Sequence, residues 1–361
     1  MPLNVFILIN LLLLIGTLLP MLRQEIWWIR GLDFPRLQFC ILGVILLIAE
    51  CLLLDFSQPL SLPLILVTLV CLLYQGWWIL PYTRLVRCEV QSADKQNANA
   101  AHNFKIMTAN VLMSNRQADK LINQVQHYQP DILVTLETDH WWQQQLDQLQ
   151  SAYPYSIKCP QDNLYGMHVY SRLELNESEI KYLVEADIPS MHTQIKLGCG
   201  ANVYTHFLHP APPSPVENDK STERDAELLA VAKTITEHNH PVIVTGDLND
   251  VAWSKTTQLF RKISGLLDPR IGRGMFNTFH ASYPFMRWPL DHLFHSKHFR
   301  LQHIERLHIA GSDHFALLTC LSYQPDKFNG ENGLHPDKGD QQLAEDKMQR
   351  KGVDTTDVPK P

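Results

Sequence analysis

The first 90 residues contain three long apolar stretches. The first 22 residues contain no charged side chain, residues 37–54 contain only Glu50, and residues 56–83 again contain none. Stretches of about 18–21 apolar residues match a hydrocarbon core of about 30 Å at 1.5 Å rise per residue. The alternative is a signal peptide followed by buried core helices. It fits poorly, because the N-terminus lacks Lys and Arg and two more stretches follow. The pattern therefore predicts three membrane-spanning helices, near residues 3–22, 37–54 and 60–80.

The remaining chain divides by polarity into three parts. Residues 91–103 are polar and rich in Ala and Asn, which predicts a linker, and residues 324–361 have almost no apolar periodicity, which predicts a disordered tail. Residues 104–323 are long enough for one domain with a full core. Strand-like runs occur near 104–111, 131–137, 168–171, 194–197, 202–208, 241–246, 290–295 and 314–322, and helical periodicity near 116–128, 139–149 and 221–238. This mixture predicts an α/β sandwich of two sheets with helices outside.

Basic residues near the apolar stretches predict the orientation. Arg23, Arg30 and Arg36 lie between the first and second stretches, and Arg84 and Arg87 follow the third. Because Lys and Arg collect on the cytoplasmic side, the domain is predicted to be cytoplasmic. Seven scattered cysteines without CxxC spacing suit a reducing compartment and argue against a zinc cluster. Glu50 lies close to a span end and is interpreted as an interfacial residue.

Polar side chains that could take part in catalysis or metal binding occur where predicted strands end. They are oxygen donors and imidazoles, which hold hard divalent cations and act on phosphate esters: Asn110, Glu137, His209, Asp247, Asn249, Asp291, Asp313 and His314. The formal charge of −6 offers no broad basic surface for tracking long nucleic acids, and it leaves a local phosphate site possible.

Two of these sites point to metal-assisted attack by water. Glu137 closes an apolar strand, and Mg²⁺ in proteins is held by one or two carboxylates, waters and substrate phosphate. In the Gly246–Asn249 turn, Leu248 should face the core while Asp247 and Asn249 project together on the other side. Asp247 could then position or deprotonate a water, and Asn249 could donate to the charge growing on phosphoryl oxygens.

The imidazole candidates come from two further motifs. Asp291 beside His314 would favour the imidazolium and fix its tautomer, and Asp313 could serve either the metal or the water. His209, before a Pro-rich loop, is favoured over His206 as the remaining catalytic imidazole.

Together these motifs resemble the endonuclease/exonuclease/phosphatase (DNase I-like) superfamily. The resemblance covers residues 104–323 and lies in TANV, LVTLE, the strand ending in Ser-Arg, LHPAPP, GDLN, PLDHLF and SDH, although Thr135 departs from the usual pattern before Glu137. It implies a four-layer α/β sandwich and Mg²⁺ or Mn²⁺ as the cofactor. It also implies that Glu137 holds metal with Asn110 nearby and that His209 is catalytic or contacts phosphate. Arg224 is a candidate phosphate contact.

With membrane helices in front, the chain most resembles bacterial membrane-anchored members of that superfamily. We therefore expect a phosphoesterase of the bacterial inner membrane with its site in the cytoplasm. Its substrate could be nucleic acid, a phospholipid or a small metabolite, and no obligate protein partner is evident. The alternative from another class is a catalytically idle, membrane-tethered binding module. The motifs leave the substrate open, because specificity should lie in loops such as 210–220 and 270–288.

Overall fold

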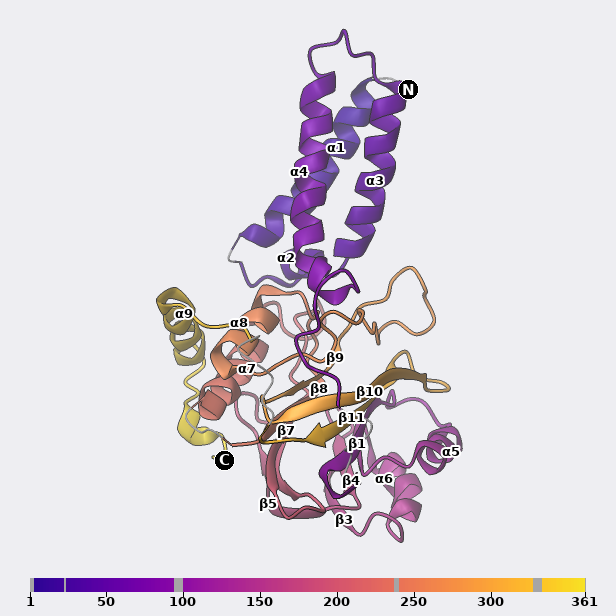
Figure 1. Cartoon of the computed structure of the whole chain (residues 1–361), viewed down its shortest axis with the longest axis vertical. Coiled ribbons are helices and arrows are strands. Elements are labelled where there is room, and N and C mark those ends of the chain that lie inside the picture. Colours follow the sequence, from indigo (N-terminus) through magenta and orange to yellow (C-terminus); the bar gives the residue numbers. More distant parts are fainter. Residues whose placement is uncertain (1–2, 23, 94–99, 237–239, 327–332, 361) are drawn as a thin grey trace.

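Three apolar helices stand side by side at one end of the molecule (Figure 1). The computed structural model describes residues 3–22, 24–93, 100–236, 240–326 and 333–360. The apolar helices are α1 (Leu3–Leu18), α3 (Arg36–Leu53) and α4 (Ser61–Ile79), and the short α2 (Trp27–Arg30) lies between the first two. Each of the three is long and apolar enough to cross a membrane. The spans run over Leu3–Met21, Arg36–Leu53 and Ser61–Tyr82, so the first and third include the short turns that extend α1 and α4. The three predicted helices are thus present.

The interior of this bundle holds a polar cluster. The Asn10 amide donates to Glu50 Oε1, and the Thr68 hydroxyl donates to Asn10 Oδ1 at 3.0 Å. The Glu50 side chain is fully buried, so its interpretation as an interfacial residue was wrong. Glu50 lies on the face of α3 that packs on α1 and α4, and a buried carboxyl group needs such partners. Helix packing, which the linear pattern does not show, therefore decides its environment.

Eleven strands within the described residues form two sheets. The six-stranded sheet has the order β10-β11-β1-β2-β4-β3, and the five-stranded sheet has the order β5-β6-β7-β8-β9. The strands of the first sheet are β1 (Asn103–Asn110), β2 (Ile132–Leu136), β3 (Tyr155–Cys159), β4 (Met167–Ser171), β10 (Phe299–His308) and β11 (Phe315–Tyr323). Those of the second are β5 (Glu174–Lys181), β6 (Ser190–Lys196), β7 (Asn202–Phe207), β8 (Val242–Asp247) and β9 (Asp291–His295).

The two sheets pack face to face between two layers of helices. Their inner faces share one apolar core, and the hydroxyls of Thr108 on β1 and Thr245 on β8 lie 2.8 Å apart across it. The helices are α5 (Ala118–Tyr128) and α6 (His140–Leu146) outside the first sheet, and α7 (Thr222–Thr236), α8 (Lys255–Ser264) and α9 (Lys338–Gln349) outside the second. The predicted four-layer sandwich is confirmed.

The elements that the pattern missed are polar or lie at sheet edges. β5 has the sequence ELNESEIK and is partly exposed along its whole length, and β3 is an edge strand of the other sheet. An edge strand buries little, so its sequence lacks an apolar run. α8 was missed because only three of its ten residues (Leu259, Phe260 and Ile263) are apolar, although these lie on one face.

The C-terminal segment is ordered over residues 333–360, so the predicted disordered tail was wrong there; residues 327–332 lie outside the described part. Ala344 and Met348 of α9 pack on α7 and α8, and Val353 and Val358 beyond it are also buried. These few apolar side chains lie on one face and are supplemented by ion pairs, so the segment folds on a surface that the sequence pattern did not reveal.

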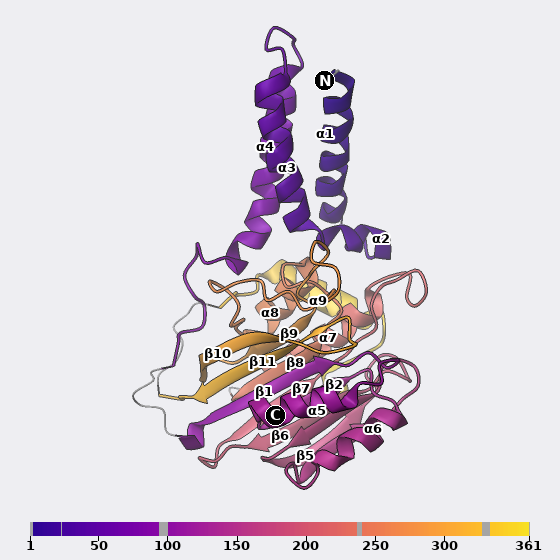
Figure 2. The same ribbon diagram turned by 90° about the vertical axis from the view of Figure 1, so that its right-hand side faces the viewer.

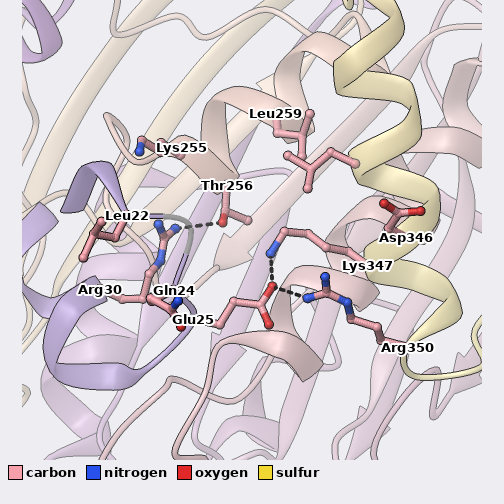
Figure 3. Close-up of a pocket in the computed structure, with 11 residues that line it drawn as sticks. Leu22, Gln24, Glu25, Arg30, Lys255, Thr256, Leu259, Asp346, Lys347 and Arg350 are labelled. Carbon is pink, nitrogen blue, oxygen red and sulfur yellow. Dashed lines mark hydrogen bonds and ion pairs between the residues drawn. The ribbon is translucent and has the colours of Figure 1, made fainter. Parts of the chain in front are cut away.

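α9 also connects the domain to the N-terminal helical bundle, which we call the anchor (residues 3–82) (Figure 3). The Lys347 ammonium lies 2.5 Å from Glu25 Oε1, in the loop between α1 and α2, and 2.8 Å from Asp225 Oδ2. Arg350 also pairs with Glu25, and Arg30 donates to the Thr256 hydroxyl at 2.9 Å. These contacts border a cavity of about 230 Å³. The first and last parts of the chain thus meet at the base of the bundle.

The base of the bundle packs directly on the loop that follows β8. Tyr82 donates to the Ala252 carbonyl at 2.6 Å, and the Trp253 indole donates to the Asp33 carbonyl at 2.8 Å. The predicted linker begins too early, since the Gln91 carbonyl accepts from the Leu301 amide of β10 and the Ala93 amide donates to the Leu301 carbonyl. Residues 94–99 lie outside the described part. The anchor and the domain are therefore packed together before the linker.

Candidate active site

The predicted site residues converge because of strand direction. β1 runs parallel to β2, and β7 runs parallel to β8, while β11 and β9 run antiparallel to β1 and β8. The starts of β9 and β11 therefore meet the ends of β8 and β1, and Asp247 and Asp291 are register partners. Residues far apart in sequence thus gather at one end of the two sheets.

His314 lies between two carboxylates. Its Nδ1 is 2.8 Å from Asp291 Oδ2 and its Nε2 is 3.6 Å from Asp247 Oδ2. Burial alone lowers the pKa of His314, but the carboxylates of Asp291 and Asp247 raise it to about 10. The ring of Phe279 packs on the imidazole with centroids 4.9 Å apart. His314 is thus held as a buried imidazolium at neutral pH, as the sequence predicted for the pair with Asp291.

Glu137 lies beside Asn110 at the ends of the two central parallel strands. The Asn110 amide donates to Glu137 Oε1 at 2.7 Å and to Asp247 Oδ2 at 3.3 Å, so it joins the two carboxylates. Burial, and to a lesser extent the charges of Asp313 and Asp247, raise the pKa of Glu137 to about 7 against the lowering effects of the Asn110 hydrogen bond and of His314. Glu137 has a φ of +60°, a sparsely populated conformation for a residue with a side chain. A cation near Glu137, Asp247 and Asp313 would relieve the repulsion among these carboxylates.

The turn after β8 fixes Asp247 and Asn249. Gly246 has a φ of +151°, and a Cβ atom there would lie 1.9 Å from the Leu208 carbonyl oxygen, so only glycine fits. The Asn249 backbone amide donates to Asp247 Oδ1 at 2.9 Å, and its side-chain amide donates to the Pro210 carbonyl at 3.0 Å. Leu248 is buried, as predicted.

The two candidate histidines of β7 and its following loop have separate environments. His206 Nδ1 lies 2.7 Å from Nδ1 of His192 on the neighbouring strand. Burial lowers the pKa of His209 to about 4, and the charges of Asp247 and His314 act on it, so it lies near these two residues. Within the described residues, His209 Nδ1 is buried without a hydrogen-bond partner. The structure therefore brings His209, and not His206, to the other site residues.

Asp313 borders the site beside Glu137. Its backbone carbonyl accepts from the Ala281 amide at 2.6 Å, and its negative charge raises the pKa of Glu137. Asp313 Oδ1 and Asp291 Oδ1 are buried and have no hydrogen-bond partner among the residues that the structure places.

Arg224 does not line the site, so its interpretation as a phosphate contact was wrong. Its guanidinium is fully buried, lies 3.1 Å from Asp225 Oδ1 and 3.2 Å from Asp250 Oδ2, and donates to the Asn249 carbonyl at 2.6 Å. It therefore positions the Asn249 turn from beneath. No sequence pattern indicated this role, because Asp250 is adjacent to Arg224 only in the folded chain.

The donor set fits a hard divalent cation. Carboxylate and amide oxygens are the ligands that Mg²⁺ prefers. One group of potential ligand atoms, from Asp247, Asp291 and His314, lies within 4.8 Å of one another. An imidazolium has no free lone pair for a metal, so the residues that can hold a cation are Glu137 and Asn110, with Asp247 and Asp313 adjacent.

Sequence reasoning missed several residues that position these groups. The Ser312 hydroxyl donates to the Asn110 carbonyl at 2.7 Å and accepts from the His314 amide at 2.9 Å. The Thr278 hydroxyl accepts from the Asp291 amide at 3.1 Å. Tyr165 packs on His209, with ring centroids 5.3 Å apart. Ser312 and Tyr165 lie within or beside the family-like motifs and could have been found there; Thr278 lies in a loop without a pattern.

Comparisons with known proteins agree with this geometry. Solved structures with a similar fold include a humanized TDP2 of D. rerio (18% identity, TM-score 0.52, covering 61% of this chain and 99% of that chain). The human nocturnin catalytic domain with bound sulfate has 18% identity, a TM-score of 0.51 and coverages of 62% and 95%. A Bacteroides vulgatus endonuclease/exonuclease/phosphatase has 18% identity, a TM-score of 0.50 and coverages of 62% and 99%. At these identities the likeness concerns the fold alone. No curated protein sequence matches the chain. Residues 107–314, more than half of the sequence, match the family model, and the chain belongs to the Endonuclease/Exonuclease/phosphatase family.

Proposed function

We propose that this chain is a membrane-anchored, divalent-metal-dependent phosphoesterase. The observation that carries the proposal is the gathering of Glu137, Asp247 and Asp291 around one buried imidazolium, His314, at one end of the sandwich. Members of the family to which the chain belongs are phosphoesterase hydrolases. The three apolar helices support the membrane attachment.

Each residue has a role that its contacts support. Asp247 accepts a proton from the attacking water, whose oxygen bonds to phosphorus as the ester P–O bond breaks. His314, oriented by Asp291, donates to the phosphoryl oxygens, and Asn249 and His209 border the same space. The leaving oxygen takes a proton from solvent.

The cation would be Mg²⁺ or Mn²⁺. Glu137 and Asn110 would hold it, with Asp313 on the same side of the site. When bound, it would neutralise phosphate charge and polarise the phosphoryl group.

The site geometry is compatible with nucleic-acid and other phosphate-ester substrates. One similar structure is described as D. rerio TDP2 in complex with a single-strand DNA product, which supports an endonuclease or exonuclease activity. Against it stands the net charge of −6 of this chain. The alternative substrates are a phospholipid or a small metabolite.

A substrate panel tests the proposal. The full chain in detergent should be used, because Tyr82 and Val90 pack on the domain and a truncated chain that starts at residue 90 would lose the first contact. With Mg²⁺ or Mn²⁺, the panel should include plasmid DNA, abasic DNA, phospholipids, inositol phosphates and bis(p-nitrophenyl) phosphate. We expect hydrolysis of at least one substrate by the wild type and its loss in Asp247→Asn. If the wild type and Asp247→Asn bind a substrate equally well and the wild type hydrolyses none, the result would instead support an idle binding module.

A further inference from the structure

Two loops that border the catalytic centre are both joined to the membrane anchor. The loop after His209 reaches the anchor at its far end, where the Trp27 amide donates to the Asp219 carbonyl and the Ser221 amide donates to the Glu25 carbonyl, each at 2.9 Å. The second loop, residues 279–288, begins with Phe279 on the catalytic imidazole. Figure 2 shows loops of the domain rising towards the base of α1 and α2. The site is therefore built next to the membrane anchor.

The second loop carries an exposed apolar tip at the level of the membrane helices. The Gln38 side chain, in the first turn of α3, donates to the Phe285 carbonyl at 2.7 Å. The side chain of Phe285 is 88% exposed, and those of Tyr283 and Met286 are 59% and 55% exposed. We call residues 283–286 the apolar tip. Because α3 is long and apolar enough to cross a membrane, the tip lies at the level where the chain would enter the bilayer.

Such exposure is unfavourable in water and favourable at a membrane interface. An exposed aromatic and a neighbouring Met are disfavoured by the hydrophobic effect, whereas aromatic side chains are enriched at the level of lipid headgroups. Trp28 and Trp77, in α2 and near the end of α4, are likewise exposed near the base of the bundle. The apolar tip therefore continues the surface that the three helices present to lipid.

The base of the same loop forms one wall of the site. The Ala281 amide donates to the Asp313 carbonyl at 2.6 Å, and the ring of Phe279 lies 4.9 Å from that of His314. Phe285 follows Phe279 by six positions along the chain, and six steps span at most about 20 Å. The backbone of Phe279, whose ring packs on the His314 imidazole, is thus at most about 20 Å from that of Phe285 in the apolar tip.

We propose that the apolar tip inserts into the bilayer interface and that the site hydrolyses phosphate esters carried by membrane lipids. The proposal rests on the proposed phosphoesterase function and names its substrate class. A lipid phosphate is concentrated at this surface, whereas a long nucleic acid would have to approach a negatively charged chain beside an apolar loop. The two anchored loops would then select substrate by its location.

The test compares two phosphodiesters with one leaving group. Hexadecyl p-nitrophenyl phosphate in phosphatidylcholine vesicles presents the ester at a membrane, and methyl p-nitrophenyl phosphate presents it in solution. The full chain is reconstituted with Mg²⁺ as wild type, as Phe285→Ser/Met286→Ser and as Tyr155→Ser. Tyr155, 39% exposed on β3, is the matched control, since β3 lies at the end of the domain away from the bundle (Figure 1).

We expect the tip variant to lose at least about tenfold in kcat/KM on the hexadecyl ester and less than twofold on the methyl ester. Tyr155→Ser should change neither. Equal losses on both esters, or no loss on either, would overturn the lipid assignment while leaving the phosphoesterase function intact. Absence of turnover of both esters by a wild type that hydrolyses another substrate of the panel would overturn the lipid assignment alone. Absence of turnover of every panel substrate would refute the phosphoesterase function, and the lipid assignment with it.

A second measurement tests the insertion without any activity. Phe285→Trp and Tyr155→Trp each add one indole to the full chain in nanodiscs. Brominated lipids should quench the additional emission of Phe285→Trp and leave that of Tyr155→Trp unchanged. Equal quenching of the two, or none of Phe285→Trp, would contradict insertion of the tip.

Discussion

Replacing Asp291 by Asn should lower the pKa of His314 and reduce turnover. Asp291 Oδ2 lies 2.8 Å from His314 Nδ1, both side chains are buried, and the pKa of His314 is raised from 6.5 to about 10. At about 1.4 kcal/mol per pKa unit, the fold stabilises the imidazolium over the neutral imidazole by on the order of 5 kcal/mol more than water does, even after the cost of burial. Asp291 contributes more to this than Asp247. Its removal should therefore lower the pKa of His314 by about two units or more.

The assay is the pH dependence of kcat/KM on a soluble phosphodiester, supported by NMR titration of labelled histidine. The protonated form donates to phosphate, so activity is lost as pH rises through the pKa of His314. We expect this basic limb near pH 10 in the wild type and at least about two units lower in Asp291→Asn, together with a rate loss of about 10²–10⁴-fold at pH 8.

Two controls separate this from a general loss of structure. The double variant Asp291→Asn/His314→Ala should be little slower than His314→Ala alone, because the two side chains act as a unit. The stability that His314 contributes should be full below about pH 6.5 and be lost as pH rises through about 10. An unmoved basic limb with strictly additive rate losses would refute the assignment of Asp291 as the residue that orients His314.

Three other predictions follow from buried charges and from the anchor. Arg224→Met should destabilise the fold by about 3–5 kcal/mol, because it leaves Asp250 buried without its ion-pair partner and Asp225 with Lys347 alone. Chemical denaturation measures this, and wild-type stability would contradict it. Glu227 is buried and its pKa is raised to about 8 by burial and then by Glu185. The stability that its protonated form contributes is full below about pH 4.5 and lost as pH rises through about 8, so Glu227→Gln should melt above wild type at about pH 8.5 and close to it at about pH 5; a pH-independent difference would count against this. Finally, alkaline phosphatase fused after residue 90 should be inactive, since the arginines around the spans predict a cytoplasmic domain; an active fusion would reverse the orientation.

The sequence was most informative where local pattern and chemistry coincide. Three long apolar stretches predicted three helices, and apolar runs leading into Asn110 and Asp247 predicted the strands that end there. The parallel and antiparallel strand order then brings these ends together. Both the sandwich and most of the candidate site were therefore predictable from the chain alone.

What the sequence could not show depends on contacts between distant segments. Arg224 resembles a free cation at the start of a helix, yet the fold places Asp250 against it. Glu50 looked interfacial by its position in a span, yet α1 and α4 supply its partners. Lys347 of the C-terminal helix pairs with Glu25 in the loop after the first helix, at the other end of the sequence. No local pattern encodes such pairs, so the tail and the attachment of the anchor were misjudged.

The metal dependence of turnover is the decisive test of the proposed phosphoesterase function. The full chain in detergent should be assayed on bis(p-nitrophenyl) phosphate across a Mg²⁺ titration, as wild type and as Glu137→Gln. EDTA should abolish wild-type turnover and Mg²⁺ should restore it. Because Glu137 would hold the cation beside Asn110, Glu137→Gln should need more Mg²⁺ for half-maximal rate and lose roughly 10²-fold or more at saturation. Full activity in EDTA, or an unchanged Mg²⁺ dependence in Glu137→Gln, would contradict the account.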